Sequence, residues 1–395
     1  MNRREVKRAP VLRFKGFTND WEQRKLGYEV NFYSGLTYHP DDIRNSGVFV
    51  IRSSNIKNNR LISADNVFVN PQIVNSKPVH INDIVVVVRN GSRKLIGKHV
   101  LIQHELHDTV IGAFMTGIRS SNNFFINATL DSQLFKKEIQ KNLGSTINQI
   151  TVKNFQNMVF GFPSKIEKDK IGKLFRIIDN IISLQQRKLS LIKTLKRSFL
   201  SDLFFKTSTN SIVITLKQVT SIRGGYAFKS KEFTENGYPI IKIANISNNG
   251  EIKGPYSYTN NFNKKYILTK NDIVLAMSGA TTGKIAKLRS SKSFLQNQRI
   301  GYFCKTNNID YNYLYYLLIS DQFKKQLKRI TIAGAQPNVS SLDIENFRFS
   351  VLSSKNKQKK ISDFLNKLDI KIRITNKKIT IFSQLKRSLL NNMFI

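Results

Sequence analysis

A glycine-rich segment that ends in lysine is the first feature of this chain that could do chemistry. The segment Gly279–Lys284 reads GATTGK and follows an apolar run, which is where nucleotide-binding phosphate loops occur. A phosphate loop has four residues between its glycines and a Ser or Thr after its lysine. Here there are three residues between them, and Ile285 follows. The sequence predicts no ATP site at this loop. A basic, glycine-rich loop at a strand end suits a DNA backbone better.

The other residue types that could catalyse a reaction lack suitable partners. The single cysteine, Cys304, excludes a disulfide framework and a paired-cysteine zinc site. Asp83 and Asp272 each follow an asparagine at a predicted strand start, which favours turn or capping chemistry over metal ligation. A dispersed nuclease site of Asp, Glu and Lys is the alternative. We expect a non-catalytic chain without a metal, and see no metal-ligand spacing among His39, His80, His99, His104 and His107.

Composition points to a polyanionic partner. The 395 residues include 64 Lys and Arg against 26 Asp and Glu, a net charge of +38. Lysine and arginine release condensed counterions when they neutralise phosphates, so DNA and RNA both fit this charge. No apolar run approaches the length needed to cross a membrane, and the first fifteen residues do not resemble a signal peptide. We therefore expect a cytoplasmic protein that does not bind membranes.

The second half of the chain repeats the first. Asn55 lies in VIRSSNI and Asn245, 190 residues later (245 − 55), lies in IIKIANI. A period this long excludes a solenoid and indicates two copies of one domain, each followed by a long helix. Further matches pair NDIVVVV (Asn82–Val88) with NDIVLAM (Asn271–Met277), and GSTINQITVKNF (Gly144–Phe155) with GAQPNVSSLDIENF (Gly334–Phe347).

Apolar residues at alternating spacings of four and three predict a coiled-coil seam in both long helices. The two seams most simply pair with each other, and an antiparallel pairing would place the two domains at opposite ends. The two polar exceptions fall at equivalent positions, Gln185 with Thr375 and Lys196 with Lys386. The apolar seam positions are Ile171, Phe175, Ile178, Ile182, Leu189, Ile192, Phe199 and Leu203 in the first helix, and Ile361, Leu365, Leu368, Ile372, Ile379, Phe382, Leu389 and Met393 in the second.

The segments between the helices predict an α+β fold, that is, two repeated mixed α/β domains separated by two long helices that form an antiparallel coiled coil. We place the first domain at 1–164, the central helix at 165–208, the second domain at 209–353 and the C-terminal helix at 354–395. Shorter helices are expected at Ser132–Asn142 and Tyr311–Lys328. Short β-branched runs predict strands at Val48–Arg52, Asp83–Val88, Lys98–Ile102, Ile212–Leu216, Tyr238–Ile243, Asp272–Met277 and Arg299–Phe303.

This organisation resembles the specificity subunit of type I restriction–modification systems. FTNDWEQRKLGYEV (Phe17–Val30) looks like the start of the family's first target-recognition domain. GAQPNVSSLDIENF before the second helix, and LKRSFL and LKRSLL toward the helix ends, also match. The family's Pro-x-x-x-Glu-Gln start of each helix departs here to PSKIEKDKI and SSKNKQKKI, which puts the modification-subunit contacts at those corners in doubt.

The resemblance implies a function without catalysis by this chain. Each domain would read one half of a split, asymmetric target in double-stranded DNA, and the coiled coil would set the spacing and dock partners. The partners would be two modification subunits that use S-adenosylmethionine to methylate adenine, and two restriction subunits that use ATP and magnesium. No cofactor is expected in this chain itself.

Base reading needs Arg, Lys, Asn, Gln, Ser or Thr at base edges, with phosphate contacts fixing the register. For any single Arg or Lys, a solvated surface position is the alternative. Asn55 and Asn245 are shared by the copies, so we expect them to hold a turn; for Gln149 and Asn338, a turn and a phosphate contact are both open. The candidates for DNA contact are Tyr38, Arg52, Ser54, Arg89, Ser92, Arg93 and Lys94 in the first domain, and Tyr226, Lys229, Lys242, Ser278, Thr281, Thr282, Lys284, Gln298 and Arg299 in the second.

Two other function classes fit part of the pattern. A stand-alone sequence-specific DNA-binding regulator would also be basic and duplicated, and it would bind one site tightly without methylase partners. A structural RNA-binding protein would bind RNA in a salt-dependent way without preferring a DNA sequence. Neither explains the paired heptads as well as a spacer between two DNA-reading domains does.

Overall fold

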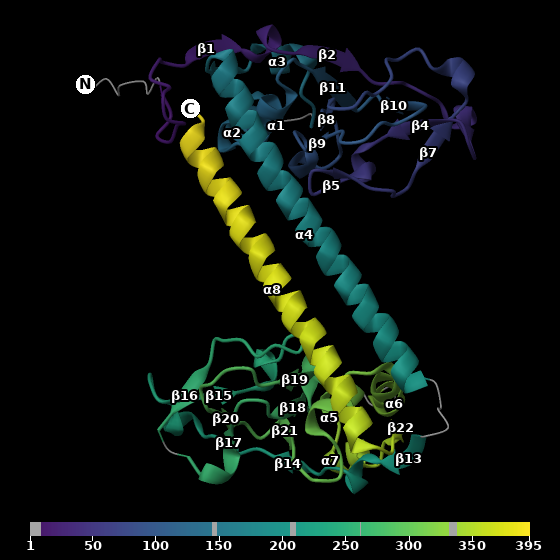
Figure 1. Cartoon of the computed structure of the whole chain (residues 1–395), viewed down its shortest axis with the longest axis vertical. Helices are drawn as coiled ribbons and strands as arrows, with labels where there is room; N and C mark the ends of the chain where they lie inside the picture. Colours follow the sequence, from purple (N-terminus) through teal and green to yellow (C-terminus); the bar gives the residue numbers. More distant parts are fainter. Residues whose placement is uncertain (1–8, 144–147, 206–210, 261, 332–337) are drawn as a thin grey trace. The chain divides into compact units, whose positions relative to one another are not determined.

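A computed structural model of the chain describes residues 9–143, 148–205, 211–260, 262–331 and 338–395, except for the side chains of 203–205. The chain divides into two compact units. The first unit comprises Met1–Arg187 with Asn376–Ile395, and the second comprises Lys188–Thr375. Each unit therefore holds one copy of the repeat together with part of both long helices (Figure 1).

The first unit is built from two four-stranded sheets and three short helices. One sheet is antiparallel with the order β2-β11-β8-β9, and the other has the order β10-β4-β7-β3 with β10 parallel to β4. The bounds are β1 Glu22–Lys25, β2 Asn31–Ser34, β3 Ile43–Arg44, β4 Val48–Ile51, β5 Ile56–Lys57, β6 Arg60–Leu61, β7 Val67–Val69, β8 Ile84–Val87, β9 His99–Leu101, β10 Thr109–Ile111, β11 Met115–Arg119, α1 Asn123–Asp131, α2 Gln133–Asn142, α3 Val152–Asn157 and β12 Val159–Phe162. β1 pairs with β12, and β5 with β6.

The second unit repeats this topology. Its antiparallel sheet has the order β14-β21-β18-β19, and its mixed sheet the order β16-β15-β20-β17, with β15 parallel to β20. The bounds are β13 Ser211–Thr215, β14 Ile222–Gly224, β15 Tyr238–Ile241, β16 Ser257–Thr259, β17 Ile267–Leu268, β18 Ile273–Ala276, β19 Ile285–Lys287, β20 Phe294–Gln296, β21 Ile300–Phe303, α5 Tyr311–Leu318, α6 Asp321–Thr331, α7 Ser341–Glu345 and β22 Arg348–Leu352. β13 pairs with β22, as β1 does with β12. The repeat in the sequence is thus a repeat of topology, and the seven predicted strands are present with ends shifted by one or two residues.

The duplicated Asn-Asp pairs are turns, as the sequence predicted. Asn82 and Asn271 have φ values of 69° and 73°, in the left-handed region that asparagine tolerates better than most residues. Asp83 Oδ2 accepts a hydrogen bond from the His80 N–H, and Asp272 Oδ2 accepts one from the Thr269 N–H. These carboxylates hold the turn before β8 and before β18, the strands at the centre of each antiparallel sheet.

The short helices differ from the prediction in two respects. The expected single helix Tyr311–Lys328 is two helices, α5 and α6, because the chain breaks at Ser320, whose hydroxyl donates to the Leu317 carbonyl. The first unit has the same break at Ser132, which caps α2 through the Phe135 N–H. The helix before that break, α1, was not expected, since its sequence NFFINATLD buries residues on most sides and has only a weak helical period.

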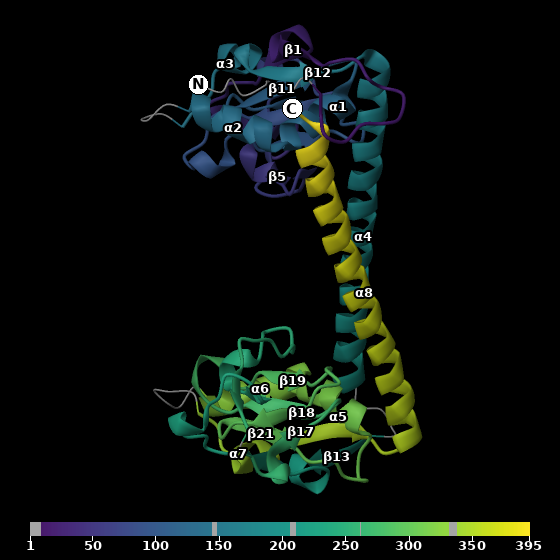
Figure 2. The ribbon, with the colours of Figure 1, turned by 90° about the vertical axis from the view of Figure 1, so that its left-hand side faces the viewer.

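The long helices α4 (Lys165–Phe205) and α8 (Lys355–Met393) pack together and run antiparallel (Figure 2). In the first unit Phe175 of α4 stacks against Phe394, which follows α8, and in the second unit Phe199 of α4 stacks against Phe364 of α8. An early residue of α4 therefore meets the end of α8, and a late residue of α4 meets the beginning of α8. The apolar seam positions given above are all buried or half-buried, except that the side chain of Leu203 lies outside the described residues.

Both helices also complete the core of each unit. In the first unit Ile171, Phe175, Leu390 and Met393 belong to the same apolar cluster as the sheet residues Ile84–Val87. In the second unit Leu365 and Leu368 join the cluster that contains the β18 side chains of Ile273 and Leu275. Because burying one such side chain stabilises a fold by about 1.5–3 kcal/mol, each domain is held to the helix pair by several of these contributions.

Candidate nucleic-acid interface

The Gly-Lys pairs that suggested a phosphate loop close a β-hairpin in each unit. Gly97 and Gly283 have φ values of 82° and 81°, and their N–H groups donate to the carbonyls of Val87 and Ala276. The lysine N–H after each glycine is also engaged within its turn. These N–H groups hold the hairpin β8–β9 or β18–β19 and do not point at a ligand. The pair is therefore part of the framework.

Asn55 and Asn245 hold a turn in both units, which confirms the prediction made from their duplication. Each side-chain oxygen accepts the N–H of the residue three positions earlier, Arg52 or Lys242. Each amide nitrogen donates to backbone carbonyls, of Ala64 in the first unit and of Lys253 and Pro255 in the second. Both side chains are buried and do not reach the surface where DNA could lie.

Three first-unit candidates line one cavity. Tyr38, Arg52 and Ser54 surround a space of about 560 Å³ that lies against β4 and the beginning of β11. The Arg52 guanidinium is paired with Asp65 at 2.6 Å, so its donors are only partly available. Phe114, which sequence reasoning missed, stands at the edge of this cavity with 54% of its surface exposed.

Arg89 lies beside this cavity, at a corner where three segments meet. Its guanidinium carbon is 5.1 Å from the centre of the Phe114 ring, in a cation–π arrangement. The N–H groups of Val88 and Arg89 donate to the Phe114 carbonyl, and the Ile150 N–H donates to the Val88 carbonyl. The corner thus joins the end of β8, the beginning of β11 and the loop before α3. Residues 144–147 of that loop lie outside the described residues.

The second unit has the same corner with different side chains. The Met277 N–H donates to the Arg299 carbonyl, and the Val339 N–H donates to the Met277 carbonyl. Arg299 Nη1 donates a hydrogen bond of 3.2 Å to Ser278 Oγ. Of the candidates, the structure brings together Ser278, Gln298, Arg299 and Asn338 here, while residues 334–337 of the predicted loop lie outside the described residues.

The other second-unit candidates lie on three loops. Tyr226 stacks with Phe228 and Tyr266, and its hydroxyl donates to Glu232, whose charge raises the pKa of the Tyr226 phenol. Lys242 Nζ lies over the Phe233 ring and donates to Ser257 Oγ at 2.7 Å. Lys229 is exposed, and Thr281, Thr282 and Lys284 lie half-buried on the hairpin loop between β18 and β19.

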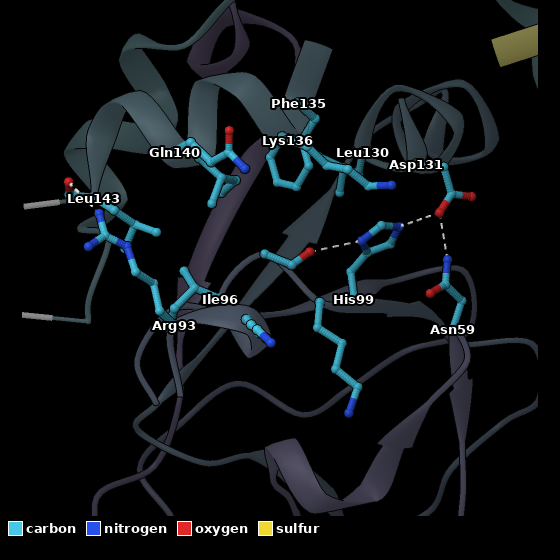
Figure 3. Close-up of a pocket in the computed structure, with 14 residues that line it drawn as sticks. Asn59, Arg93, Ile96, His99, Leu130, Asp131, Phe135, Lys136, Gln140 and Leu143 are labelled. Atoms are coloured by element: carbon cyan, nitrogen blue, oxygen red, sulfur yellow. Dashed lines mark hydrogen bonds and ion pairs between the residues drawn. The ribbon is translucent and has the colours of Figure 1, made fainter. Parts of the chain in front are cut away.

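Ser92, Arg93 and Lys94 lie on the equivalent loop of the first unit, and Arg93 and Lys94 line a second cavity of about 620 Å³ (Figure 3). Arg93 donates to the Leu143 carbonyl, and Lys98 and Lys136 add two more cations. The floor is apolar and includes Leu130, Phe135 and Ile139. A cavity of about 400 Å³ in the second unit has Lys284, Lys324, Leu318, Phe323 and Leu327 at the equivalent places.

A buried charged group closes one side of the first cavity. His99 Nε2 is 3.3 Å from Asp131 Oδ1, and Asp131 Oδ2 accepts a hydrogen bond of 2.6 Å from Lys386 of α8 (Figure 3 shows the His99 contact). Burial disfavours the Asp131 carboxylate, yet the hydrogen bond and charge of His99 and the Lys386 ammonium hold its pKa below the ordinary value. These residues link β9, α1 and α8, so the group fastens the first domain to the helix pair.

The described residues contain no group of three or more His, Cys, Asp or Glu side chains that could hold a metal ion. None of the described helices is long and apolar enough to span a membrane. Exposed basic side chains on loops, rather than a catalytic cluster, are what both units present.

Comparison with known proteins decides the family. The family described as "Type I restriction modification DNA specificity domain" matches residues 18–194 and again residues 210–381. The chain belongs to this family. Its two matches fall on the two copies of the repeat and extend into the long helices, which agrees with the resemblance found in the sequence.

Individual members of the DNA specificity family are similar over part or all of the chain. The MjaVIII specificity subunit of Methanocaldococcus jannaschii is 28% identical over 274 residues, which is 63% of this chain and 64% of that protein. The StySPI specificity subunit of Salmonella potsdam is 23% identical over 235 residues, 57% of this chain and 49% of that protein. The chain thus spans less than two thirds of the curated relatives that it matches.

A solved structure shares the fold over almost its whole length. The S subunit of a type I restriction–modification system from M. genitalium aligns with a TM-score of 0.71 at 16% identity, over 98% of this chain and 99% of that one. At this identity the likeness shows the fold alone, which is two repeated α/β halves with long helices packed together.

Proposed function

We propose that this chain is the DNA specificity subunit of a type I restriction–modification complex and has no catalytic activity of its own. Family membership supports the role in DNA specificity. The net charge of +38 and the exposed basic loops support binding to a polyanion. The proposed partners are double-stranded DNA, two modification subunits and two restriction subunits. S-adenosylmethionine, ATP and magnesium would act on those partners.

The observation that carries the proposal is one framework with two sets of exposed side chains. The turns at Asn82 and Asn271 and the antiparallel sheets are the same in both units. The exposed positions differ: Arg89 in the first unit corresponds to Ser278, and Phe114 corresponds to Arg299. Two domains of one fold with different exposed side chains suit two different half-sites, so the whole target would be split and asymmetric.

The helix pair would set the distance between the half-sites. At about 1.5 Å per residue, the 41 residues of α4 span about 60 Å. One turn of duplex is about 34–36 Å, so a spacer of this length would let two domains at its opposite ends address half-sites on one side of the DNA. The apolar seam, from Ile171 to Phe199 in α4 and from Ile361 to Leu389 in α8, would keep that distance constant.

The remaining DNA-contact candidates divide by their surroundings. Exposed residues on loops, such as Ser92, Lys229 and Gln298, are free to reach base edges. Arg52 and Lys242 are held by Asp65 and Ser257, so their role would be to present a fixed donor.

Genome-wide mapping of methylated adenine tests the proposal. Cells that make the chain together with its modification subunit should methylate a split, asymmetric motif that cells without the chain do not. Replacing residues 209–353 by the second domain of another family member should change one half of the motif and leave the other half intact. A complex that assembles but methylates no motif would contradict the proposal.

A further inference from the structure

We propose that each unit carries one guanidinium anchor for the DNA backbone at the corner described above, Arg89 in the first unit and Arg299 in the second. This inference rests on the proposed function and assigns a role to one place in it. The anchor would fix the register of each domain on the duplex and would not read bases.

The two arginines come from different strands of the corner but serve the same place. Arg89 follows β8, and its equivalent in the second unit is Ser278; Arg299 precedes β21, and its equivalent in the first unit is Phe114. The equivalence rests on matching backbone bonds, since Val88 N–H donates to the Phe114 carbonyl at 3.0 Å and Met277 N–H donates to the Arg299 carbonyl at 3.0 Å. In the first unit the guanidinium lies over its neighbour's ring, and in the second it bonds its neighbour's hydroxyl. The residue types have been exchanged and the guanidinium has been kept.

Each guanidinium is supported and still available. The Phe114 ring covers one face of the Arg89 guanidinium, which leaves the N–H donors at its edge directed outward. Ser278 takes one of the donors of Arg299. Both arginines are exposed, and neither has a carboxylate within 4.0 Å among the described residues. Support by a neighbour reduces the conformational entropy that an arginine loses when it binds an anion.

A phosphate suits this group better than a base does. The two domains are proposed to read different half-sites, and the feature that different half-sites have in common is the phosphate backbone. The corner is also held by the same backbone bonds to the loop before α3 and to the loop before α7, through Ile150 and Val339. A cation fixed to the shared framework would meet the same part of the DNA in both halves.

The test exchanges the two side chains of one corner. Arg89→Ser removes the guanidinium from the first unit, and Arg89→Ser with Phe114→Arg returns it from the other strand, as in the second unit. Lys25→Ala, which changes an exposed cation on β1, is the matched control. Each variant is made in the full complex with the modification subunit. Binding is measured to a duplex with the methylated target and to one with both half-sites scrambled, over a range of KCl concentrations.

Arg89→Ser should weaken binding to both duplexes by the same factor, about 5- to 10-fold near 0.1 M salt, and lower the salt slope by about 0.9. The methylated motif should not change. The double variant should regain the salt slope and most of the affinity, and Lys25→Ala should alter neither quantity. The reverse exchange, Ser278→Arg with Arg299→Phe, should likewise bind better than Arg299→Phe alone.

Loss of binding confined to the target duplex, or relaxation of one motif position, would make Arg89 a base-reading residue and overturn the inference. Failure of the double variant to recover, with a motif and a thermal unfolding midpoint like those of the original chain, would overturn it as well. In both cases the proposed function would stand, because the unaltered complex still directs methylation to a motif. If the unaltered complex directs none, both proposals fall together.

Discussion

Lys386 of α8 donates a hydrogen bond of 2.5 Å to Asp179 of α4. The same bond recurs in the second unit with the helices exchanged, where Lys196 of α4 donates to Asp369 of α8 at 2.5 Å. The two lysines are equivalent in the repeat, and so are the two aspartates, since both pairs are 190 residues apart (386 − 196 and 369 − 179). The polar exceptions in the predicted seams therefore have partners, each on the opposite helix. A buried pair of this kind favours one register of two helices over its alternatives.

Replacing Lys386 should destabilise the first unit strongly. In Lys386→Met the carboxylates of Asp131 and Asp179 lose their shared cation while they remain largely buried. Breaking a buried pair costs about 3–5 kcal/mol, and we expect a loss in the free energy of unfolding near that range in urea titrations. Lys377→Met, an exposed lysine on the same helix, is the control and should stay within about 0.5 kcal/mol of the original chain. Equal stability of the two variants would show that the pair contributes nothing.

The charge on Asp131 should give the first unit an acid-sensitive contribution to stability. His99 and Lys386 lower the pKa of Asp131 in the folded state, so its contribution is present above the unfolded pKa of about 3.9 and is lost as the pH falls through the folded value. Asp131→Asn should be less stable than the original chain at pH 7 by about 2–3 kcal/mol, with Asp179 still beside Lys386. The difference should shrink as the pH is lowered below about 4. Chemical unfolding at several pH values checks this, and a difference that stays constant to low pH would refute it.

The helix seam should be sensitive to charge where the outward face is not. Ile182 and Ile372 are half-buried in the seam, whereas Leu184 and Ile374 are exposed on the same helices. Ile182→Asp or Ile372→Asp should lower the free energy of unfolding by about 2–4 kcal/mol, because a carboxylate at a packed position loses hydration and apolar contacts. Leu184→Asp and Ile374→Asp should change the stability of the isolated subunit by less than about 1 kcal/mol.

The same seam variants bear on assembly. If the helix pair sets the half-site spacing, Ile182→Asp should weaken assembly with the modification subunits and blur the spacer length in the methylated motif together. Size-exclusion chromatography of the complex and motif mapping measure the two effects. Unaltered assembly and methylation in both Ile182→Asp and Ile372→Asp would contradict a spacer role for the seam.

Much of the fold was accessible from the sequence, because its signals are local or duplicated. Heptad spacing predicted α4 and α8, and β-branched runs between Asn and Gly clusters predicted the central strands. Comparison of the two copies also separated framework from surface, since Asn55 and Asn245 proved to hold a turn. The break at Ser320 went unpredicted because Tyr311–Lys328 keeps an apolar face across it.

The candidate site was less accessible, because it depends on pairings between distant segments. Phe114 carries no signal in a single copy, and its place beside Arg89 follows from the β8–β11 register. The alignment that equates it with Arg299 could have drawn notice to it, but the two positions are 185 residues apart (299 − 114) where the rest of the framework is shifted by about 190. Likewise, the partners of Lys196 and Lys386 follow from how the antiparallel helices are paired, which heptad spacing does not give.

Gly225 is a second residue whose importance only the structure reveals, and it yields a sharp prediction. A Cβ atom at Gly225 would lie 2.1 Å from the carbonyl oxygen of Asn297, and at Gly35, its equivalent, 2.1 Å from that of Gly112. The chain passes from one sheet to the other here, and backbone contacts backbone. Gly225→Ala should cost about 2–3 kcal/mol, because main-chain atoms on both sides would have to move apart. The neighbouring Gly224→Ala has no atom within 4 Å of its new Cβ and should stay within about 1 kcal/mol. Thermal unfolding of the two variants side by side measures the contrast, and equal midpoints would show that the strand crossing in the second unit is not tightly packed.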